Sequence, residues 1–143
     1  MILNTLVLIA AFVLMEAVAW LTHKYIMHGF LWSLHKDHHQ PKNGIEKNDL
    51  FGIFFAAVAI VCIKIGFEEL NYFFWAGLGI TAYGFAYFLF HDVIVHRRIN
   101  WPFKSESPYL KKIIRAHKIH HKNTGKEGGQ FFGFLFVKGK DKV

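Results

Sequence analysis

The histidines of this chain fall into two short motifs, and each motif occurs twice. The first copy comprises an HxxxxH pair and an HxxHH triplet, at His23, His28, His35, His38 and His39. The second copy repeats both spacings, at His91, His96, His117, His120 and His121. All ten histidines belong to these motifs, which scattered core or surface positions would not produce. The repeat therefore requires a fold that brings four motifs together, and it predicts one metal centre built from two half-sites.

The triplet spacing suits metal ligation from a helix. Histidines at i, i+3 and i+4 fall within about 100° of arc on an α-helix, so three imidazole rings share one face. The pair is a weaker signal, because residues i and i+5 are turned by about 140° on an ideal α-helix. Its two rings then reach one site only across a cleft, or if the second lies past the helix end. Pro41 and residues 123–125 predict that both triplet helices end just beyond their histidines.

Apolar runs predict a membrane protein. Of the 143 residues, 53% are hydrophobic, which exceeds the share in a typical soluble domain. Residues 1–21, 50–66 and 71–95 form runs that can each cross a hydrocarbon core of about 30 Å. The first run predicts a span rather than a cleaved signal peptide, because no basic segment opens it and Glu16 interrupts it. We therefore expect a single all-α membrane-embedded domain over residues 1–143.

Basic residues predict the orientation of the spans. Four lie between His23 and Asp49 and twelve follow Val95, whereas the Glu68-Glu69 turn has none. By the positive-inside rule, both histidine half-sites then lie on the cytoplasmic face, carried by helices there. The net charge of +7 alone would suit nucleic acid, but no nucleic-acid-binding motif accompanies it, so the expected partner is the lipid membrane. Gly77, Gly79 and Gly84 predict close helix approach, and residues 131–137, too short to cross, predict a packing or interfacial segment.

The number of candidate histidine ligands indicates how many metal ions the centre would hold. Ten nitrogen ligands exceed what one tetrahedral zinc ion needs, and suit two ions with five or six ligands each. Imidazole itself does not discriminate among zinc, copper, iron and nickel. Carboxylates that accept from the outer ring nitrogens would offset the charge of two such ions, and the candidates are Glu16, Asp37 and Asp92. No catalytic residue beyond the metal ligands is indicated.

The four motifs HKYIMH, HKDHH, HDVIVH and HKIHH resemble those of the bacterial β-carotene hydroxylases, in the fatty acid hydroxylase and sterol desaturase superfamily. Residues 15–16, 48–50, 81–84 and 125–128 are similar as well. The resemblance implies a non-haem di-iron enzyme that hydroxylates C3 of β-ionone rings, taking β-carotene through β-cryptoxanthin to zeaxanthin. It also implies O2, a carotenoid that arrives from the bilayer, and an electron donor such as ferredoxin with its reductase. The family is usually drawn with four spans, so both three and four remain open.

For this chain the resemblance implies two iron ions held by all ten histidines, in the inner membrane if the source is bacterial. Zinc, which stands above Fe(II) in the Irving–Williams order, could replace iron in a purified sample. A related membrane desaturase or lipid hydroxylase would use similar histidines and differ in product. A haem-binding electron carrier would place paired histidines on facing spans. A metal transporter would carry ionisable residues deep in several spans, where only Glu16 and Lys64 qualify.

Overall fold

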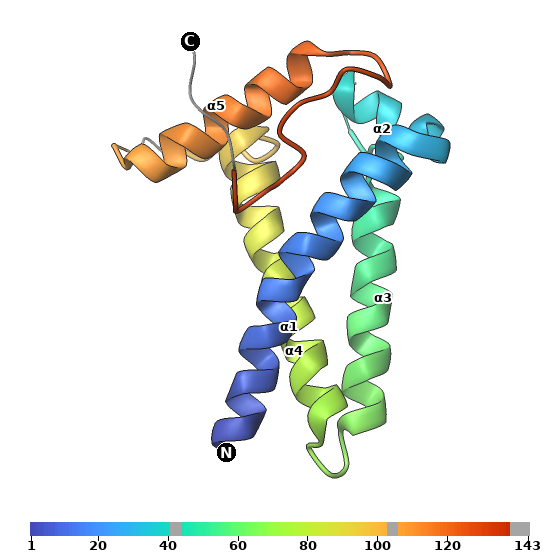
Figure 1. Ribbon diagram of the computed structural model, residues 1–143, viewed down its shortest axis with the longest axis vertical. Coiled ribbons are helices and arrows are strands. Elements are labelled where there is room, and N and C mark those ends of the chain that lie inside the picture. Colours follow the sequence, from blue (N-terminus) through green and yellow to red (C-terminus); the bar gives the residue numbers. More distant parts are fainter. Residues whose placement is uncertain (41–43, 103–105, 138–143) are drawn as a thin grey trace.

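The computed structural model describes residues 1–40, 44–102 and 106–137, whose regular elements are all helical. Three long helices form a stem (Figure 1): α1 (Ile2–Leu21), α3 (Asp49–Gly66) and α4 (Tyr72–Tyr87). Two π-helices continue α1 and α4 at one end of the stem: η1 (Thr22–Phe30) and η2 (Phe88–Val95). There the chain forms a head, made of α2 (Trp32–His39), α5 (Pro108–Lys122) and residues 123–137.

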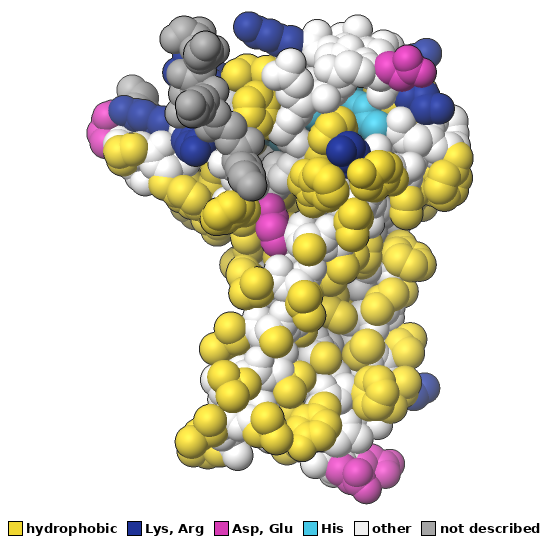
Figure 2. Space-filling model, viewed as in Figure 1, with side chains coloured by type: hydrophobic (Ala, Val, Ile, Leu, Met, Phe, Trp, Pro, Cys, Tyr) yellow, Lys and Arg dark blue, Asp and Glu magenta, His cyan; other side chains and the backbone are white. Residues whose placement is uncertain are grey.

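The stem has the length and the surface of a membrane-spanning bundle. Ile2–Phe30, Asp49–Gly66 and Tyr72–Val95 are each long and apolar enough to cross a membrane. Hydrophobic side chains such as Leu6 and Ile53 are exposed, and Figure 2 shows that such side chains cover the visible face of the stem. The described residues contain three helices of this kind, which confirms the predicted all-helical fold with three spans.

Two glycines let α4 pack closely against both of its neighbours. A Cβ on Gly79 would lie 2.4 Å from the Leu8 carbonyl oxygen of α1, and one on Gly77 would lie 2.9 Å from the Ala59 carbonyl oxygen of α3. These distances leave no room for a side chain, as predicted. The same prediction was wrong for Gly84, where a Cβ would meet nothing within 4 Å.

The hairpin between α3 and α4 lies at the end of the stem opposite the head (Figure 1). The Asn71 side chain begins α4 by accepting a hydrogen bond from the Phe73 N–H at 3.0 Å. Glu68 and Glu69 are exposed in this turn, whereas most lysines and arginines visible in Figure 2 lie on the head. Most basic residues and the acidic turn therefore lie at opposite ends of the long axis of the molecule.

The first histidine pair lies in the π-helix η1, and the second begins in η2 and ends at His96, the residue just past that helix. In this geometry an N–H bonds to the carbonyl five residues earlier, so residues i and i+5 come to lie nearly one above the other. The His96 N–H accordingly donates to the His91 carbonyl at 2.8 Å. Within η1, His23 and His28 are therefore not separated by the roughly 140° of an ideal α-helix, whereas His96 lies just past the end of η2, which is one of the two arrangements expected for the pair. Within η1 the helix also breaks at Gly29, directly after His28, and the chain turns there toward α2.

The two triplet helices end where the sequence predicted. Helix α2 ends at His39 and α5 ends at Lys122, each at or next to the last histidine of its triplet. Pro41 lies outside the described residues. Residues 131–137 contain no helix and pack against the junction of stem and head, which confirms their prediction as a packing segment.

Candidate metal centre

All ten histidines converge beneath the head. Cluster A comprises five of them: His23, His28, His35, His39 and His120. Cluster B comprises four more: His38, His96, His117 and His121. Within each cluster, one ring nitrogen per residue lies within 4.8 Å of those of the others. The tenth histidine, His91, borders cluster B, with its Nε2 atom 3.1 Å from Nε2 of His38. The structure therefore brings every predicted ligand together.

Each cluster contains one histidine from the sequence copy that supplies most of the other cluster. In the first sequence copy, the outer members of the triplet, His35 and His39, join cluster A, and the middle member, His38, joins cluster B. In the second copy the middle member, His120, crosses in the opposite sense and completes cluster A. Each cluster thus takes most of its ligands from one copy and a single ligand from the other. The half-sites are interleaved rather than separate.

Hydrogen bonds fix the tautomer of every ring in cluster A. The Nδ1–H groups donate to oxygen atoms, over distances of 2.7 to 3.0 Å. In the order His23, His28, His35, His39 and His120, the acceptors are Phe132 O, Lys126 O, Asn48 Oδ1, Asn123 O and Gln130 O. These oxygens can only accept, so Nδ1 carries the proton and Nε2 keeps a lone pair.

The lone pairs of cluster A face one another. Nε2 of His35 lies 3.2 Å from that of His23 and 3.1 Å from that of His39, and no proton is available between them. Only a cation makes such an arrangement stable, and a metal–nitrogen bond of about 2.1 Å with right-angled ligands places adjacent nitrogens about 3.0 Å apart. The donor set therefore fits a metal ion. In cluster B, the buried His121 Nε2 has no hydrogen-bond partner, which fits a metal there as well.

Burial keeps the rings neutral. Removal from water, reinforced by neighbouring histidines, lowers the pKa of His35, His96 and His120 to about 3. The same two causes lower the pKa of His38 and His117 well below its usual range. The histidines of the head are therefore in the unprotonated form that binds metals at neutral pH.

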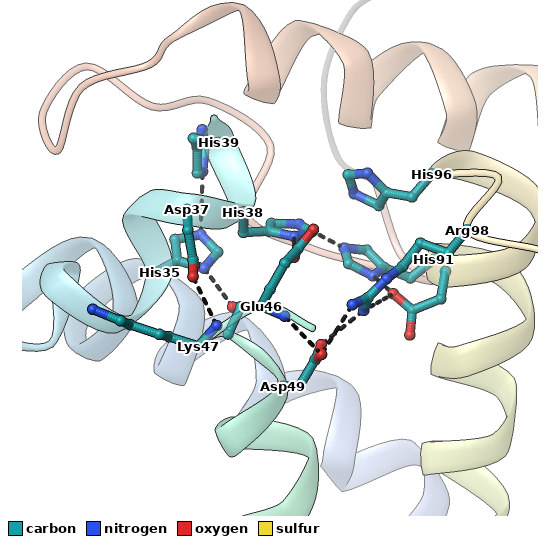
Figure 3. Close-up of polar contacts among 12 residues, drawn as sticks. His35, Asp37, His38, His39, Glu46, Lys47, Asp49, His91, His96 and Arg98 are labelled. Carbon is teal, nitrogen blue, oxygen red and sulfur yellow. Dashed lines mark hydrogen bonds and ion pairs between the residues drawn. The ribbon is translucent and has the colours of Figure 1, made fainter. Parts of the chain in front are cut away.

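Carboxylates accept from two rings in or beside cluster B. Asp92 Oδ1 accepts from Nδ1 of His91 at 2.9 Å, in the role proposed for it from the sequence. Nδ1 of His38 donates at 2.8 Å to Glu46, a buried residue that sequence reasoning missed (Figure 3). Asp37 was predicted for this role instead, but its Oδ2 atom accepts from the Lys47 backbone N–H at 2.7 Å. The Asp37 carboxylate therefore bonds to the backbone of the segment that carries Glu46 and not to a histidine ring.

Glu16 also has a different role from the predicted one. Its Oε1 atom accepts from three consecutive backbone N–H groups, at Phe134, Leu135 and Phe136. Its Oε2 atom accepts from the Tyr83 hydroxyl at 2.8 Å. The histidine nearest to Glu16 in the sequence, His23, donates from Nδ1 to the Phe132 carbonyl instead. Glu16 therefore supports the centre indirectly, by holding the segment that supplies this carbonyl.

Aromatic side chains of that segment cover the centre. The Phe132 ring lies 5.2 to 5.5 Å from the rings of His23, His28 and His120. The Phe134 ring is buried, 4.6 Å from Tyr87 and 5.3 Å from His91. These contacts keep water from one side of both clusters.

An apolar cavity of about 760 Å³ connects the centre with the stem. At its upper end it is bordered by histidines of both clusters, including His23, His35 and His117. Farther down, its wall consists mainly of apolar residues of α1, α3 and α4, among them Met15, Phe55, Ala59 and Ile80. Gly84 borders the same space, which explains why no atom lies near its missing side chain. The centre can thus receive an apolar molecule from the level of the membrane.

A comparison with protein families gives a match to the family described as fatty acid hydroxylase, over residues 8–141. The chain belongs to this family. It is 44% identical to a beta-carotene hydroxylase of Pseudescherichia vulneris over 96% of the chain and 79% of that relative. It is 43% identical to a beta-carotene hydroxylase of Pantoea ananas, over 98% of the chain and 81% of the relative. No solved structure shows significant similarity to the chain.

A plant relative is similar over a shorter part of its own length. The chain is 39% identical to beta-carotene 3-hydroxylase 1 of Arabidopsis thaliana, over 93% of the chain and 44% of that protein. Together these matches confirm the resemblance drawn from the histidine motifs, and they make the chain an enzyme of the oxygenase class.

Proposed function

We propose that this chain hydroxylates C3 of the β-ionone rings of β-carotene, giving β-cryptoxanthin and then zeaxanthin. The observation that carries the proposal is that histidines from both clusters line an apolar cavity between helices long and apolar enough to span a membrane. The bacterial relatives are named for hydroxylation of β-carotene, and the Arabidopsis relative for position 3. The proposed reaction consumes one O2, two electrons and two protons for each hydroxyl group, and releases one water.

Clusters A and B would each hold one iron ion. Two iron ions bound there would supply the activation of O2 and the oxidation of an unactivated C–H bond. The chain itself supplies the ligands and keeps them in the correct orientation, because each ring of cluster A is held by a hydrogen bond at Nδ1. The aromatic cover formed by Phe132 and Phe134 excludes bulk water from the reacting carbon.

The cavity would select and position the substrate. Its apolar walls suit a hydrocarbon ring, which gains nothing from the few polar groups along them. A C40 carotenoid dissolves in the bilayer, so entry at the level of the stem brings the ring to the histidines without passage through water. Tyr87, whose hydroxyl lies 3.4 Å from Nε2 of His91, borders the cavity where the ring would meet the centre.

The head would lie in the cytoplasm and receive electrons there. Basic residues are concentrated in the head and its connections, which favours the cytoplasmic side. On α5, Arg115, Lys118 and Lys122 are exposed, while Ala116 and His117 on the same helix are buried against the centre. An acidic electron carrier such as ferredoxin, supplied by its reductase, would therefore dock about one helix diameter from the ligands.

Expression in a β-carotene-accumulating bacterial host tests the proposal. Pigment analysis should reveal β-cryptoxanthin and zeaxanthin, and His38→Ala should abolish both while the protein still inserts into the membrane. A new double bond in place of a hydroxyl group would indicate a desaturase. Unchanged β-carotene in cells that contain the folded, iron-loaded protein would refute the proposed substrate.

A further inference from the structure

The ring nitrogens that point away from the two clusters have different partners. In cluster A all five Nδ1–H groups donate to neutral oxygens, of which four are backbone carbonyls and one is the Asn48 amide. At cluster B two rings donate to carboxylates, His38 to Glu46 and His91 to Asp92. The ligand atoms of the clusters are alike, so their main electrostatic difference lies in these partners.

The duplicated motifs do not by themselves explain the difference. His38 and His120 are the middle residues of their triplets, yet His38 donates to a carboxylate and His120 to the Gln130 carbonyl. His91 and His23 each begin a pair, yet His91 donates to Asp92 and His23 to the Phe132 carbonyl. One carboxylate-bound ring comes from each sequence copy: His38 belongs to cluster B, and His91 borders it. The negative charge is thus concentrated at one of two otherwise similar sites.

A fixed network holds these carboxylates in place (Figure 3). The Glu46 backbone N–H donates to Asp49 Oδ2 at 3.1 Å, and Asp49 accepts from the Arg98 guanidinium at 2.7 and 2.9 Å. The same guanidinium lies 3.7 Å from Asp92. Arg98 therefore links the segment that carries Glu46 to the end of η2 that carries Asp92. Glu46 is itself 7% exposed, so solvent screens its charge only weakly.

We infer that the two metal sites are inequivalent, with Glu46 and Asp92 making cluster B the site that binds its metal ion more tightly and favours the more oxidised ion. This inference rests on the proposed two-metal centre. A carboxylate that accepts from the outer nitrogen makes an imidazole a more basic ligand and adds negative charge near the metal. Both effects stabilise a higher positive charge, and cluster A has neither. Metal loading is therefore sequential, with cluster B filled first.

Titration of the metal-free, detergent-solubilised protein with Co(II) alone tests this inference. We expect two ions per chain, bound in two resolved steps. Glu46→Gln, which preserves the size of the side chain, should weaken the tighter step by about 10- to 100-fold and leave the weaker step in place. Asp92→Asn should act on the same step. With iron, both variants should raise the reduction potential of one ion only, a change that a purely structural role would not produce.

The opposite exchange can be made at cluster A. Asn48→Asp places a carboxylate next to the outer nitrogen of His35. It should strengthen Co(II) binding in the weaker step, so that the affinities of the two steps become more similar. Asp37→Asn is the matched control, because Asp37 lies on the same helix as His38 but bonds to the Lys47 backbone N–H. Its titration should equal that of the unaltered chain. The melting temperature of each metal-free variant reports whether the fold is retained.

The outcomes separate the inference from the proposed function. Binding of fewer than two ions by the folded chain would overturn the two-metal centre itself. Two ions of equal affinity, or steps that Glu46→Gln and Asp92→Asn leave unchanged, would overturn the inequivalence while the two-metal centre stands. Equal weakening of both steps by Glu46→Gln would also refute the assignment of this carboxylate to cluster B.

Discussion

The Glu16 carboxylate in the first span accepts a hydrogen bond from the Phe134 backbone N–H at 2.8 Å, across 118 residues of sequence. Two further N–H groups of the same segment and the Tyr83 hydroxyl complete its partners. A carboxylate at the level of an apolar span is costly unless it is bonded in this way. Glu16 therefore fastens the segment whose carbonyl and aromatic rings form one wall of the metal centre.

Replacement of Glu16 by alanine should release this wall. A hydrogen bond to a charged group contributes roughly 1.5–3 kcal/mol, so the loss of several should reduce the free energy of unfolding by roughly 3 kcal/mol or more. Activity should fall at least as strongly, because the His23 ring loses its orientation. Thermal melting in detergent and pigment analysis measure the two effects. Glu69→Ala, in the exposed hairpin turn, should change neither, and a Glu16→Ala enzyme that matched it would contradict this role.

A side chain at Gly84 should block the substrate without disturbing the fold. The structure leaves open space where this Cβ would lie, and that space belongs to the apolar cavity. Gly84→Leu should therefore reduce turnover of β-carotene by about tenfold or more, since small displacements of a substrate from its reactive position are costly. The metal content should stay the same. Ala57→Leu, at an exposed position on α3, adds the same bulk outside the cavity and should leave turnover unchanged.

Much of this architecture could be predicted from the sequence. Hydropathy located the three candidate spans, and the repeated histidine spacings identified the residues that converge, because both signals depend on residue type and local spacing. The α-helical template used for the HxxxxH pair missed the two π-helices, whose hydrogen bonds span the same five residues, but its alternative of a second histidine past the helix end holds for His96. Of the three carboxylates predicted to accept from histidine rings, only Asp92 does so, whereas Asp37 and Glu16 accept from backbone N–H groups.

Other features depend on contacts that no local pattern encodes. The exchange of His38 and His120 between the clusters follows from how α2 and α5 face each other. Glu46 reaches His38 because the chain after α2 folds back on that helix. The carbonyl acceptors at Lys126, Gln130 and Phe132 belong to the backbone, whose oxygens are present at every residue. A sequence therefore predicts candidate metal ligands more readily than the groups that orient them.

Acid should destabilise the protein below about pH 6.5. An unfolded histidine titrates near pH 6.5, whereas the pKa of His35, His96 and His120 in the folded chain is about 3. Between these values the unfolded state binds more protons, so the free energy of unfolding decreases as the pH falls. The melting temperature of the metal-free protein in detergent should thus fall continuously from pH 6.5 toward pH 3. A melting temperature that stays constant over this range would mean that the rings are protonated when folded.

Both half-sites should be cytoplasmic. In a chain whose native thiol is removed by Cys62→Ser, Glu69→Cys should react with a membrane-impermeant thiol reagent added to intact cells. Ile45→Cys, at a position that is 95% exposed beside the head, should react only after the membrane is opened. This pattern follows from the basic residues around the head and the acidic hairpin turn. Labelling of both cysteines from outside would reverse the proposed topology.

Iron, at two ions per chain, should be the functional metal even where a purified sample contains zinc. The Irving–Williams order places Zn(II) above Fe(II) at nitrogen ligands, so ten imidazoles would take up zinc once the cell no longer controls the metal supply. Zinc has no redox chemistry and would leave O2 unreacted. A zinc-loaded protein should therefore have the thermal stability of a loaded centre and no hydroxylase activity.

Reconstitution separates these two properties. The metal-free protein is loaded with Fe(II) or Zn(II), and bound metal, melting temperature and zeaxanthin formation are measured with a chemical reductant and with ferredoxin. Both metals should raise the melting temperature, because each binds only the folded clusters, while only iron should restore turnover. Turnover should follow the filling of the second site, since the proposed chemistry needs both ions. Activity with zinc alone, or full activity at one iron per chain, would show that a different centre performs the reaction.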